Sequence, residues 1–179
     1  MTVIHIISTK DTMHFAPIYN DLYNETILIN PDRETIEIAL KNEQERIIII
    51  GHGTEYGLLD KNLKDYLIDE QNVNLLKNKN VIGIWCNAST FASIHNIEGF
   101  FTSMFLSNFK ELAENCIKIV PDITIYLENT KFAKRIQQLI KENVPTTKWS
   151  KILQNMIGND EHQFVKYNYE ALYSTDKIK

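Results

Sequence analysis

Several common fingerprints are missing from this sequence, and each absence removes a class of protein. The chain contains no Gly-rich phosphate loop, no Gly-x-Ser-x-Gly and no Cys-x-x-Cys, which are the commonest marks of nucleotide-binding proteins, serine hydrolases and redox proteins. No apolar run is long enough to span a bilayer, and residues 1–10 have neither the basic region nor the cleavage site of a signal peptide. We therefore expect a cytoplasmic protein that does not bind a membrane.

Basic residues are also scarce. Lys and Arg number 19 against 23 Asp and Glu, which leaves a net charge of -4. A chain of this charge lacks the electrostatic footprint of a nucleic-acid-binding protein, so no nucleic-acid partner is expected. The few arginines disfavour a basic pocket for an aspartate side chain. A pocket for lysine or arginine is compositionally easier, and the sequence leaves its carboxylate open among Glu55, Asp60, Glu98 and Asp122.

Cysteine occurs only twice, as Cys86 and Cys116. A disulfide is not expected in the cytoplasm, so each cysteine needs its own explanation. Cys116 is the last residue of a predicted amphipathic helix over residues 100–116, and we expect it to be a small buried hydrophobic residue there. The histidines outside the motif described below lack cysteine or carboxylate neighbours at metal-ligand spacing, so we predict neither a metal site nor a cofactor.

The length and patterning of the chain predict one α/β domain. A domain of 179 residues buries roughly 70% of the surface of its unfolded chain, enough for a hydrophobic core without disulfides. Short β-branched runs alternate with helical patterns, which predicts a three-layer α/β/α fold with a mostly parallel central sheet. We find no internal repeat or linker, and expect residues 1–179 to form this single domain.

The individual elements are predicted from apolar periodicity and from capping residues. Strands are expected at 2–9, 26–30, 46–50, 81–85 and 117–120, an edge strand at 164–169, and a hairpin or loop insertions at 57–59 and 66–68. Helices are expected at 33–44, 70–77, 100–116, 123–142 (where 123–125 also fits a strand) and from Thr146 or Thr147 to about 157. Asp32 is a plausible N-cap. Residues 10–24 form a loop or broken helix, and His5 is expected to be a core histidine.

Two of these strands end in residues that carry chemistry. The apolar run 47–50 is followed by Gly51, His52 and Gly53, and the run 81–85 is followed by Cys86. Ligands of mostly parallel sheets bind beyond the carboxyl ends of the strands, which is where His52 and Cys86 both fall. If the two strands are neighbours or next neighbours, about 5–10 Å separates their ends, and both side chains reach a common substrate.

These residue types fit nucleophilic catalysis. A thiol attacks a carbonyl carbon only as the thiolate, so Cys86 needs a nearby base or a local positive potential. His52 supplies a base, and Asn87 or Ser89 can cap a following helix whose N-terminal amides favour negative charge. Gly53 has no Cβ, so its backbone can approach a substrate closely and point its N–H at a developing oxyanion.

The apolar run ending in His52-Gly53, followed by a second run ending in Cys86, resembles the caspase-hemoglobinase superfamily (clan CD), which contains caspases, legumain, gingipains, separase and bacterial CHAT domains. In that family the His and Cys lie at the ends of adjacent central strands. The resemblance implies a caspase-like fold and a hydrolase that cleaves peptide bonds through an acyl-enzyme. It makes Cys86 the nucleophile, His52 the general acid/base, and the amides of Gly53 and Cys86 the oxyanion hole. The resemblance extends to small bacterial relatives in conflict or signalling systems.

The sequence also departs from that family. Trp85 stands directly before the nucleophile, where family members commonly carry a small residue, so its ring either occludes the site or shapes a pocket. Trp85, Asn87 and Ser89 are the weaker candidates for substrate contact. The implied partner is a peptide or protein substrate, and a protein activator or a homodimer stays open. Two alternatives remain: a catalytically inactive caspase-like binding or regulatory module, and a flavodoxin-like domain in which the His and Cys are coincidental.

Overall fold

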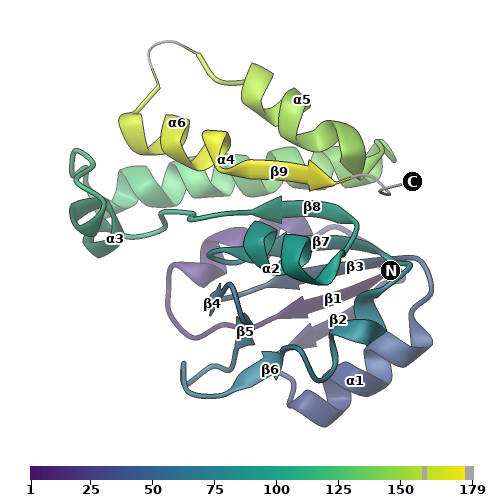
Figure 1. The fold of residues 1–179 in the computed structure, drawn as a ribbon. Coiled ribbons are helices and arrows are strands. Elements are labelled where there is room, and N and C mark those ends of the chain that lie inside the picture. The colour runs from purple at the N-terminus through teal and green to yellow at the C-terminus, as the bar shows by residue number, and fades with distance from the viewer. Residues whose placement is uncertain (159–160, 176–179) are drawn as a thin grey trace.

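The fold is mixed α/β, with a mostly parallel central sheet flanked by helices (Figure 1). The computed structural model describes residues 1–158 and 161–175. In spatial order the central sheet contains β2 (Thr26–Ile29), β1 (Thr2–His5), β3 (Arg46–Ile50), β7 (Asn80–Ile84), β8 (Gly99–Thr102) and β9 (Leu172–Thr175). Neighbouring strands are parallel except β9, which runs antiparallel to β8. The predicted α/β class with a mostly parallel sheet is confirmed.

A small antiparallel sheet and the helices complete the fold. The small sheet contains β4 (Gly53–Thr54), β5 (Gly57–Leu59) and β6 (Tyr66–Ile68). The α-helices are α1 (Arg33–Asn42), α2 (Ala88–His95), α3 (Phe109–Glu114), α4 (Asp122–Lys141), α5 (Trp149–Asn155) and α6 (Gln163–Glu170). The described residues also form the 3₁₀ helices η1 (Thr12–Ile18), η2 (Val73–Leu76) and η3 (Thr146–Lys148). Among the described residues, no helix is both long and apolar enough to cross a membrane.

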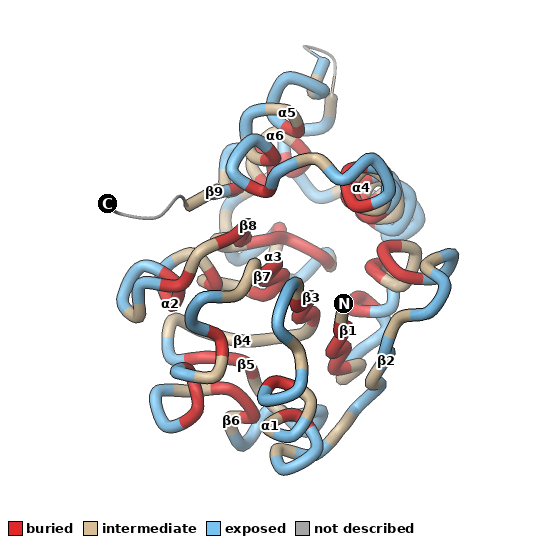
Figure 2. The backbone as a smooth tube through the Cα atoms, turned by 90° about the vertical axis from the view of Figure 1, so that its right-hand side faces the viewer, coloured by how far each residue is buried: buried red, intermediate tan, exposed pale blue. Residues whose placement is uncertain are grey.

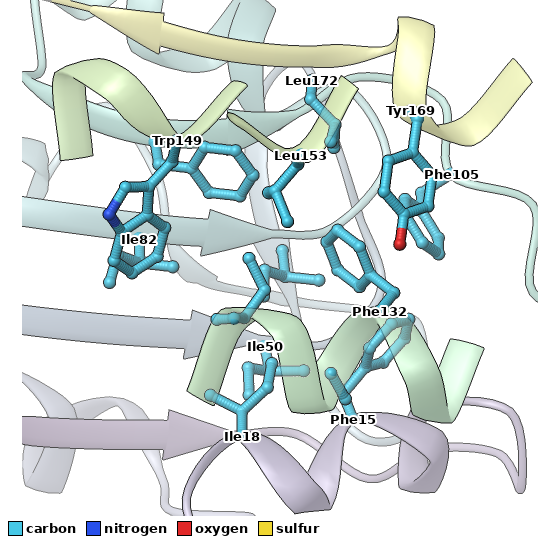
Figure 3. Close-up of a cluster of buried hydrophobic side chains, with 14 of the residues drawn as sticks. Phe15, Ile18, Ile50, Ile82, Phe105, Phe132, Trp149, Leu153, Tyr169 and Leu172 are labelled. Carbon is cyan, nitrogen blue, oxygen red and sulfur yellow. The ribbon is translucent and has the colours of Figure 1, made fainter. Parts of the chain in front are cut away.

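Each face of the central sheet packs against its own set of elements. Because side chains alternate along a strand, Ile48 and Ile82 face a core completed by α4, α5, α6 and η1, whereas Ile49 and Val81 face a core completed by α1, α2 and the small sheet. Figure 2 shows buried strands between α2 and α4. Figure 3 shows the first core, in which Phe132 of α4 packs among aromatic and aliphatic side chains. Burial on both faces explains why β3 is a continuous isoleucine run.

Most predicted elements are found close to their expected places. The strands predicted at 26–30, 46–50 and 81–85, the hairpin alternative for 57–59 and 66–68, and the helix at 123–142 agree with the structure, whereas the strand predicted over 2–9 is shorter, since β1 ends at His5. Asp32 caps α1, since its carboxylate accepts a hydrogen bond from the N–H of Thr35 at 2.8 Å. His5 is a buried core histidine whose two ring nitrogens contact the hydroxyl of Tyr19 and the carbonyl of Thr12. Of the two alternatives for residues 10–24, a loop or a broken helix, the structure shows the broken helix, because η1 covers Thr12–Ile18.

The predicted helix over 100–116 is wrong. Residues 99–102 form β8, and only 109–114 are helical, as α3. Phe100 and Phe101 pack into opposite cores, which is the alternation of a strand; a short apolar run fits both periods, and the sequence did not separate them. Cys116 therefore lies beyond a helix end, is exposed and has a φ of 55°, so its expected burial is also wrong.

Three smaller expectations are corrected as well. The segment 164–169 is part of helix α6 and not an edge strand; β9, which does lie at one edge of the central sheet, begins three residues later. Phe164 and Tyr169 are buried with Val165, a spacing that fits a helix face. Residues 117–120 form no strand, and only 73–76 of the expected helix at 70–77 are helical, as η2.

Asn168 joins helix α6 to the loop that follows β8. Its side chain is buried, accepts the N–H of Leu106 at 2.7 Å and donates to the carbonyl of the same residue at 2.9 Å. This loop carries Phe105 and Ser107, which line the candidate site described below. The Asn168 amide therefore fixes one wall of that site.

Replacing Asn168 with alanine is expected to lower the free energy of unfolding by about 1–3 kcal/mol, because a buried N–H and a buried carbonyl lose their partner. Urea unfolding followed by circular dichroism measures this difference. Asn74→Ala is the matched control, since Asn74 is exposed and surface changes typically stay within about 0.5 kcal/mol. Equal losses in the two variants would contradict the structural role of Asn168.

Candidate active site

Sheet register sets His52 and Cys86 side by side. β3 and β7 are hydrogen-bonded neighbours, and Ile50 is the register partner of Ile84. The N–H of Gly51 continues the ladder by donating to the carbonyl of Ile84 at 3.1 Å. His52 and Cys86 each lie two residues beyond the paired isoleucines, at the carboxyl ends of adjacent parallel strands.

The two side chains line one small cavity. His52 and Cys86 share its walls with residues from the ends of β3 and β7, from η1 and from the loop after β8. Its volume is about 10 Å³, which is the space that a single water molecule needs. The structure therefore brings the two predicted catalytic residues together in a nearly filled space.

The loop after β1 holds the imidazole of His52. The side chain of His52 is 20% exposed. Its Nε2 lies 2.8 Å from the hydroxyl of Thr9 and 3.7 Å from Oδ2 of Asp11. The neighbouring carboxylate of Asp11 raises the pKa of His52 above its ordinary value, although burial acts in the opposite direction. The ring is thus a stronger base than a free imidazole.

Asp11 connects three loops at the carboxyl edge of the sheet. Its buried carboxylate accepts hydrogen bonds from Thr9, from the hydroxyl of Ser107 at 3.0 Å and from the amide of Asn108 at 2.9 Å. Burial alone would raise the pKa of Asp11, but the hydrogen bonds from His52, Thr9 and Asn108 hold it well below its usual range. Asp11 is therefore a carboxylate throughout the physiological pH range.

A second carboxylate, that of Glu111, approaches the same hydroxyl. Oγ of Ser107 lies 3.0 Å from Glu111 as well as 3.0 Å from Asp11, and the N–H of Ser107 donates to Glu111 at 2.6 Å. A hydroxyl carries a single proton, so it serves one carboxylate at a time. The site consequently holds more negative charge than Asp11 alone contributes.

Cys86 is a protonated thiol in this arrangement. The residue is half-buried, and its Sγ lies 3.8 Å from the carbonyl oxygen of Phe105, to which the thiol donates. Burial raises the pKa of the Cys86 thiol to about 11, and the charges of Glu111 and Asp11 act in the same direction. Among the described residues, no hydrogen bond joins Cys86 to His52.

Gly53 and Trp85 pack against each other beneath the site. Gly53 begins β4, and a Cβ added to it would lie 2.2 Å from Cδ1 of Trp85 and 2.5 Å from the carbonyl oxygen of Gly57. Only glycine permits this approach. The Trp85 ring is 2% exposed and lies in the core with Phe91 of α2, and its indole N–H donates to the carbonyl of Thr54 at 3.3 Å.

The remaining predicted contacts lie just beyond the cavity. Asn87 occupies the N-cap position of α2 in a left-handed conformation (φ 65°), but its side chain makes no capping hydrogen bond. Its backbone N–H donates to the carbonyl of Ser103 at 3.1 Å. Ser89 is half-buried in the first turn of α2. Neither residue lines the cavity that holds His52 and Cys86.

Thr9, Asp11 and Ser107 also belong to the site but were not among the predicted residues. Thr9 and Asp11 follow β1, so the rule that drew attention to His52 and Cys86, polar residues at carboxyl ends of parallel strands, also applied to them. Ser107 was hidden by the incorrect helix over 100–116. Knowing that β1 is the other neighbour of β3 would have placed the loop after β1 beside His52.

The described residues hold no cluster of three or more His, Cys, Asp or Glu side chains arranged to bind a metal ion. Comparison of the chain with protein-family models, with curated proteins and with solved structures gives no match in any of the three. The case for a function therefore depends on the geometry of this site.

Proposed function

We propose that the protein is a caspase-like cysteine peptidase in which Cys86 attacks a peptide carbonyl and His52 moves the proton. The observation that carries this proposal is the common cavity of the two side chains at the ends of adjacent parallel strands, with Asp11 behind the imidazole. The arrangement supports a nucleophile, a base and a group that orients the base, which is the general pattern of an activated nucleophile. A caspase-like fold is part of the same proposal.

The chemistry follows from the protonation states. Because the thiol is neutral, its proton passes to the unprotonated imidazole of His52 as Sγ bonds to the carbonyl carbon, and the carbonyl oxygen becomes an oxyanion. His52 returns the proton to the leaving amine as the C–N bond breaks, which leaves a thioester on Cys86. Water then attacks the thioester while His52 takes a proton from the water, and the acid product leaves as the thiol is restored.

The carboxylate of Asp11 supports this sequence without taking part in bond making. When His52 accepts the thiol proton it becomes an imidazolium, and the negative charge 3.7 Å away stabilises that form. The amides of Gly53 and Cys86 are the proposed oxyanion donors. Among residues 1–158 and 161–175, no backbone or side-chain group accepts the N–H of Cys86, which leaves that donor free for substrate.

Covalent labelling tests the proposal directly. A peptide carrying a thiol-reactive acyloxymethyl ketone is expected to modify Cys86 and not Cys116 near neutral pH, as read by mass spectrometry of proteolytic fragments. A His52→Ala protein, which keeps both thiols, is expected to label at Cys86 much more slowly because the base is missing. Labelling that is equal at both cysteines, or that is indifferent to His52, argues against a peptidase.

A binding module without turnover is the second candidate, and the filling of the site favours it. The cavity has room for about one water molecule, and the Cys86 thiol already donates a hydrogen bond to the carbonyl oxygen of Phe105. A substrate carbonyl reaches Sγ only after the loop around Phe105 moves. If His52→Ala preserves affinity for a partner while no peptide is ever cleaved by the wild type, this second function replaces the first.

A further inference from the structure

A wide groove opens on the far side of the Asp11 carboxylate. Its walls come from the loop after β1, from η1, from the start of α3 and from the first turn of α4, and it encloses about 580 Å³. Asp11 lines this groove and lies 3.7 Å from Nε2 of His52, and Ser107 lines both the groove and the small cavity. The groove and the small cavity thus meet at Ser107, although neither His52 nor Cys86 lines the groove itself.

The walls of the groove are mainly apolar. Phe109 is 54% exposed, Ile123 is 61% exposed and Tyr126 is 44% exposed, although all three are large hydrophobic residues. Single exposed apolar side chains are ordinary, but a group of them around a concave surface marks a binding site. The volume exceeds that of one amino-acid side chain and suits a short stretch of peptide.

His14 adds an unsatisfied polar group to the groove. Its Nδ1 is buried without a hydrogen-bond partner among the described residues, and its ring packs edge-on against Tyr126 with centroids 5.0 Å apart. Burial lowers the pKa of His14, so the ring is neutral near neutral pH. Burial of a neutral imidazole beside a tyrosine ring avoids the cost of desolvating a charge, and the unpaired Nδ1 is available to hydrogen-bond the backbone of a bound peptide.

The charged residues at the rim favour an acidic neighbour. Lys10 and Lys110 both line the groove and are exposed; Lys110 pairs only with Glu114, at 3.7 Å, and Lys10 forms no ion pair within the described residues. Asp122 is the opposing carboxylate at the rim, and Asp11 already pairs with His52. The two lysines and the carboxylates of Asp11 and Asp122 are equal in number, but Lys10 is an exposed cation without an ion pair among the described residues, whereas the Asp11 carboxylate already accepts hydrogen bonds from Ser107 and Asn108.

From these contacts we propose that the groove binds the substrate segment next to the scissile bond, and that it selects a bulky apolar or aromatic side chain with an acidic residue beside it. This specificity rests on the proposed peptidase function. It differs from the basic-residue pocket that composition had favoured, because Asp122 is the only one of the four candidate carboxylates that reaches this groove, and it stands there opposite two lysines.

The test measures binding, so that it does not depend on turnover. Fluorescein-labelled, end-capped short peptides carry Phe, Leu, Ser or Lys at one central position and Glu, Ala or Lys beside it. Fluorescence anisotropy with the Cys86→Ala protein is expected to show affinity for Phe-Glu and Leu-Glu peptides at least about tenfold above the Ser-Ala and Lys-Lys peptides, a difference of about 1.4 kcal/mol.

Variants locate that binding in the groove. Ile123→Asp, made in the Cys86→Ala protein, places a charge on an exposed apolar wall and is expected to weaken the Phe-Glu peptide at least about tenfold. Lys10→Glu is expected to remove the preference for Glu and to keep the preference for Phe. Ile38→Asp is the matched control, because Ile38 is 53% exposed on α1, which packs against the other core, and it is expected to bind like its parent.

The outcomes separate this proposal from the peptidase proposal. Selective binding abolished by Ile123→Asp, with no cleavage by the wild type, supports the groove and counts against the peptidase. Cleavage by the wild type that ignores the apolar position and is unchanged by Ile123→Asp overturns the groove and leaves the peptidase standing. If the Cys86→Ala protein binds all peptides of the set with the same affinity, or binds none of them, the groove proposal is overturned as well.

Discussion

A Cys86→Ala protein is expected to lose peptide cleavage by about a thousandfold or more, because removing the nucleophile of a covalent mechanism leaves only binding and oxyanion stabilisation. The fold should survive, since Cys86 is half-buried and its thiol makes a single long hydrogen bond, to Phe105. Cleavage of a mixed peptide library, followed by mass spectrometry, measures the loss.

Cys116→Ala is the matched control for that experiment. Cys116 is exposed, lies beyond the end of α3 and does not line the cavity, so its removal is expected to leave the cleavage rate unchanged. Peptides that are cut equally well by wild type and by Cys86→Ala would show that the thiol is not the nucleophile, and the site would then be one of binding alone.

Replacing Asp11 with asparagine is expected to slow cleavage by about 10² to 10⁴-fold, the range that positioned acid–base groups commonly contribute. Asparagine keeps the size of the side chain but not the charge that raises the pKa of His52. In the wild type, cleavage is expected to rise with pH as His52 loses its proton, through a pKa above the ordinary value of about 6.5. In Asp11→Asn this rise should move to lower pH.

The shift of this pH-dependent rise in cleavage distinguishes a loss of the charge beside His52 from a loss of folded protein, since unfolding would lower the rate without moving the pH profile. Asp65→Asn is the matched control, because Asp65 is exposed, and it should leave both the rate and the pH profile in place. A lower rate for Asp11→Asn with an unmoved profile would mean that Asp11 serves the fold and not the base.

The shifted pKa values of Asp11 and His52 also predict how the free energy of unfolding depends on pH. The pKa of Asp11 is depressed on folding, so its contribution is present above its unfolded pKa of about 4 and is lost as the pH falls through the folded value. The pKa of His52 is raised, so its contribution is complete below about pH 6.5 and is lost as the pH rises through the folded value. The difference in unfolding free energy between wild type and Asp11→Asn is expected to be largest between these limits.

The sequence predicted the parts of the fold that are determined by local pattern. The isoleucine run of β3 has the length and the β-branched composition of a strand buried on both faces, and the cap at Asp32 marked the start of α1. The pattern failed where two periods coincide: Phe100 and Phe101 alternate between two cores, but the apolar residues that follow them continue at helical spacing. The same ambiguity turned α6 into an expected strand.

The site was predicted only in part for a similar reason. His52 and Cys86 follow strong strands and could be paired from the general rule for parallel sheets. Asp11 and Ser107 come from loops whose proximity depends on strand order, since β1 and β8 flank the central pair. A single sequence carries no local sign of that order, so the hydrogen-bonded carboxylate that orients the imidazole became evident only in three dimensions.

The register between β3 and β7 has one further consequence. Because Ile50 and Ile84 are partners in the ladder, the spacing of His52 and Cys86 is inherited from the sheet and not from the thirty or so residues of chain between them. The turn at 61–64, which is exposed and joins β5 to β6, should therefore accept added residues, an epitope tag or a protease site.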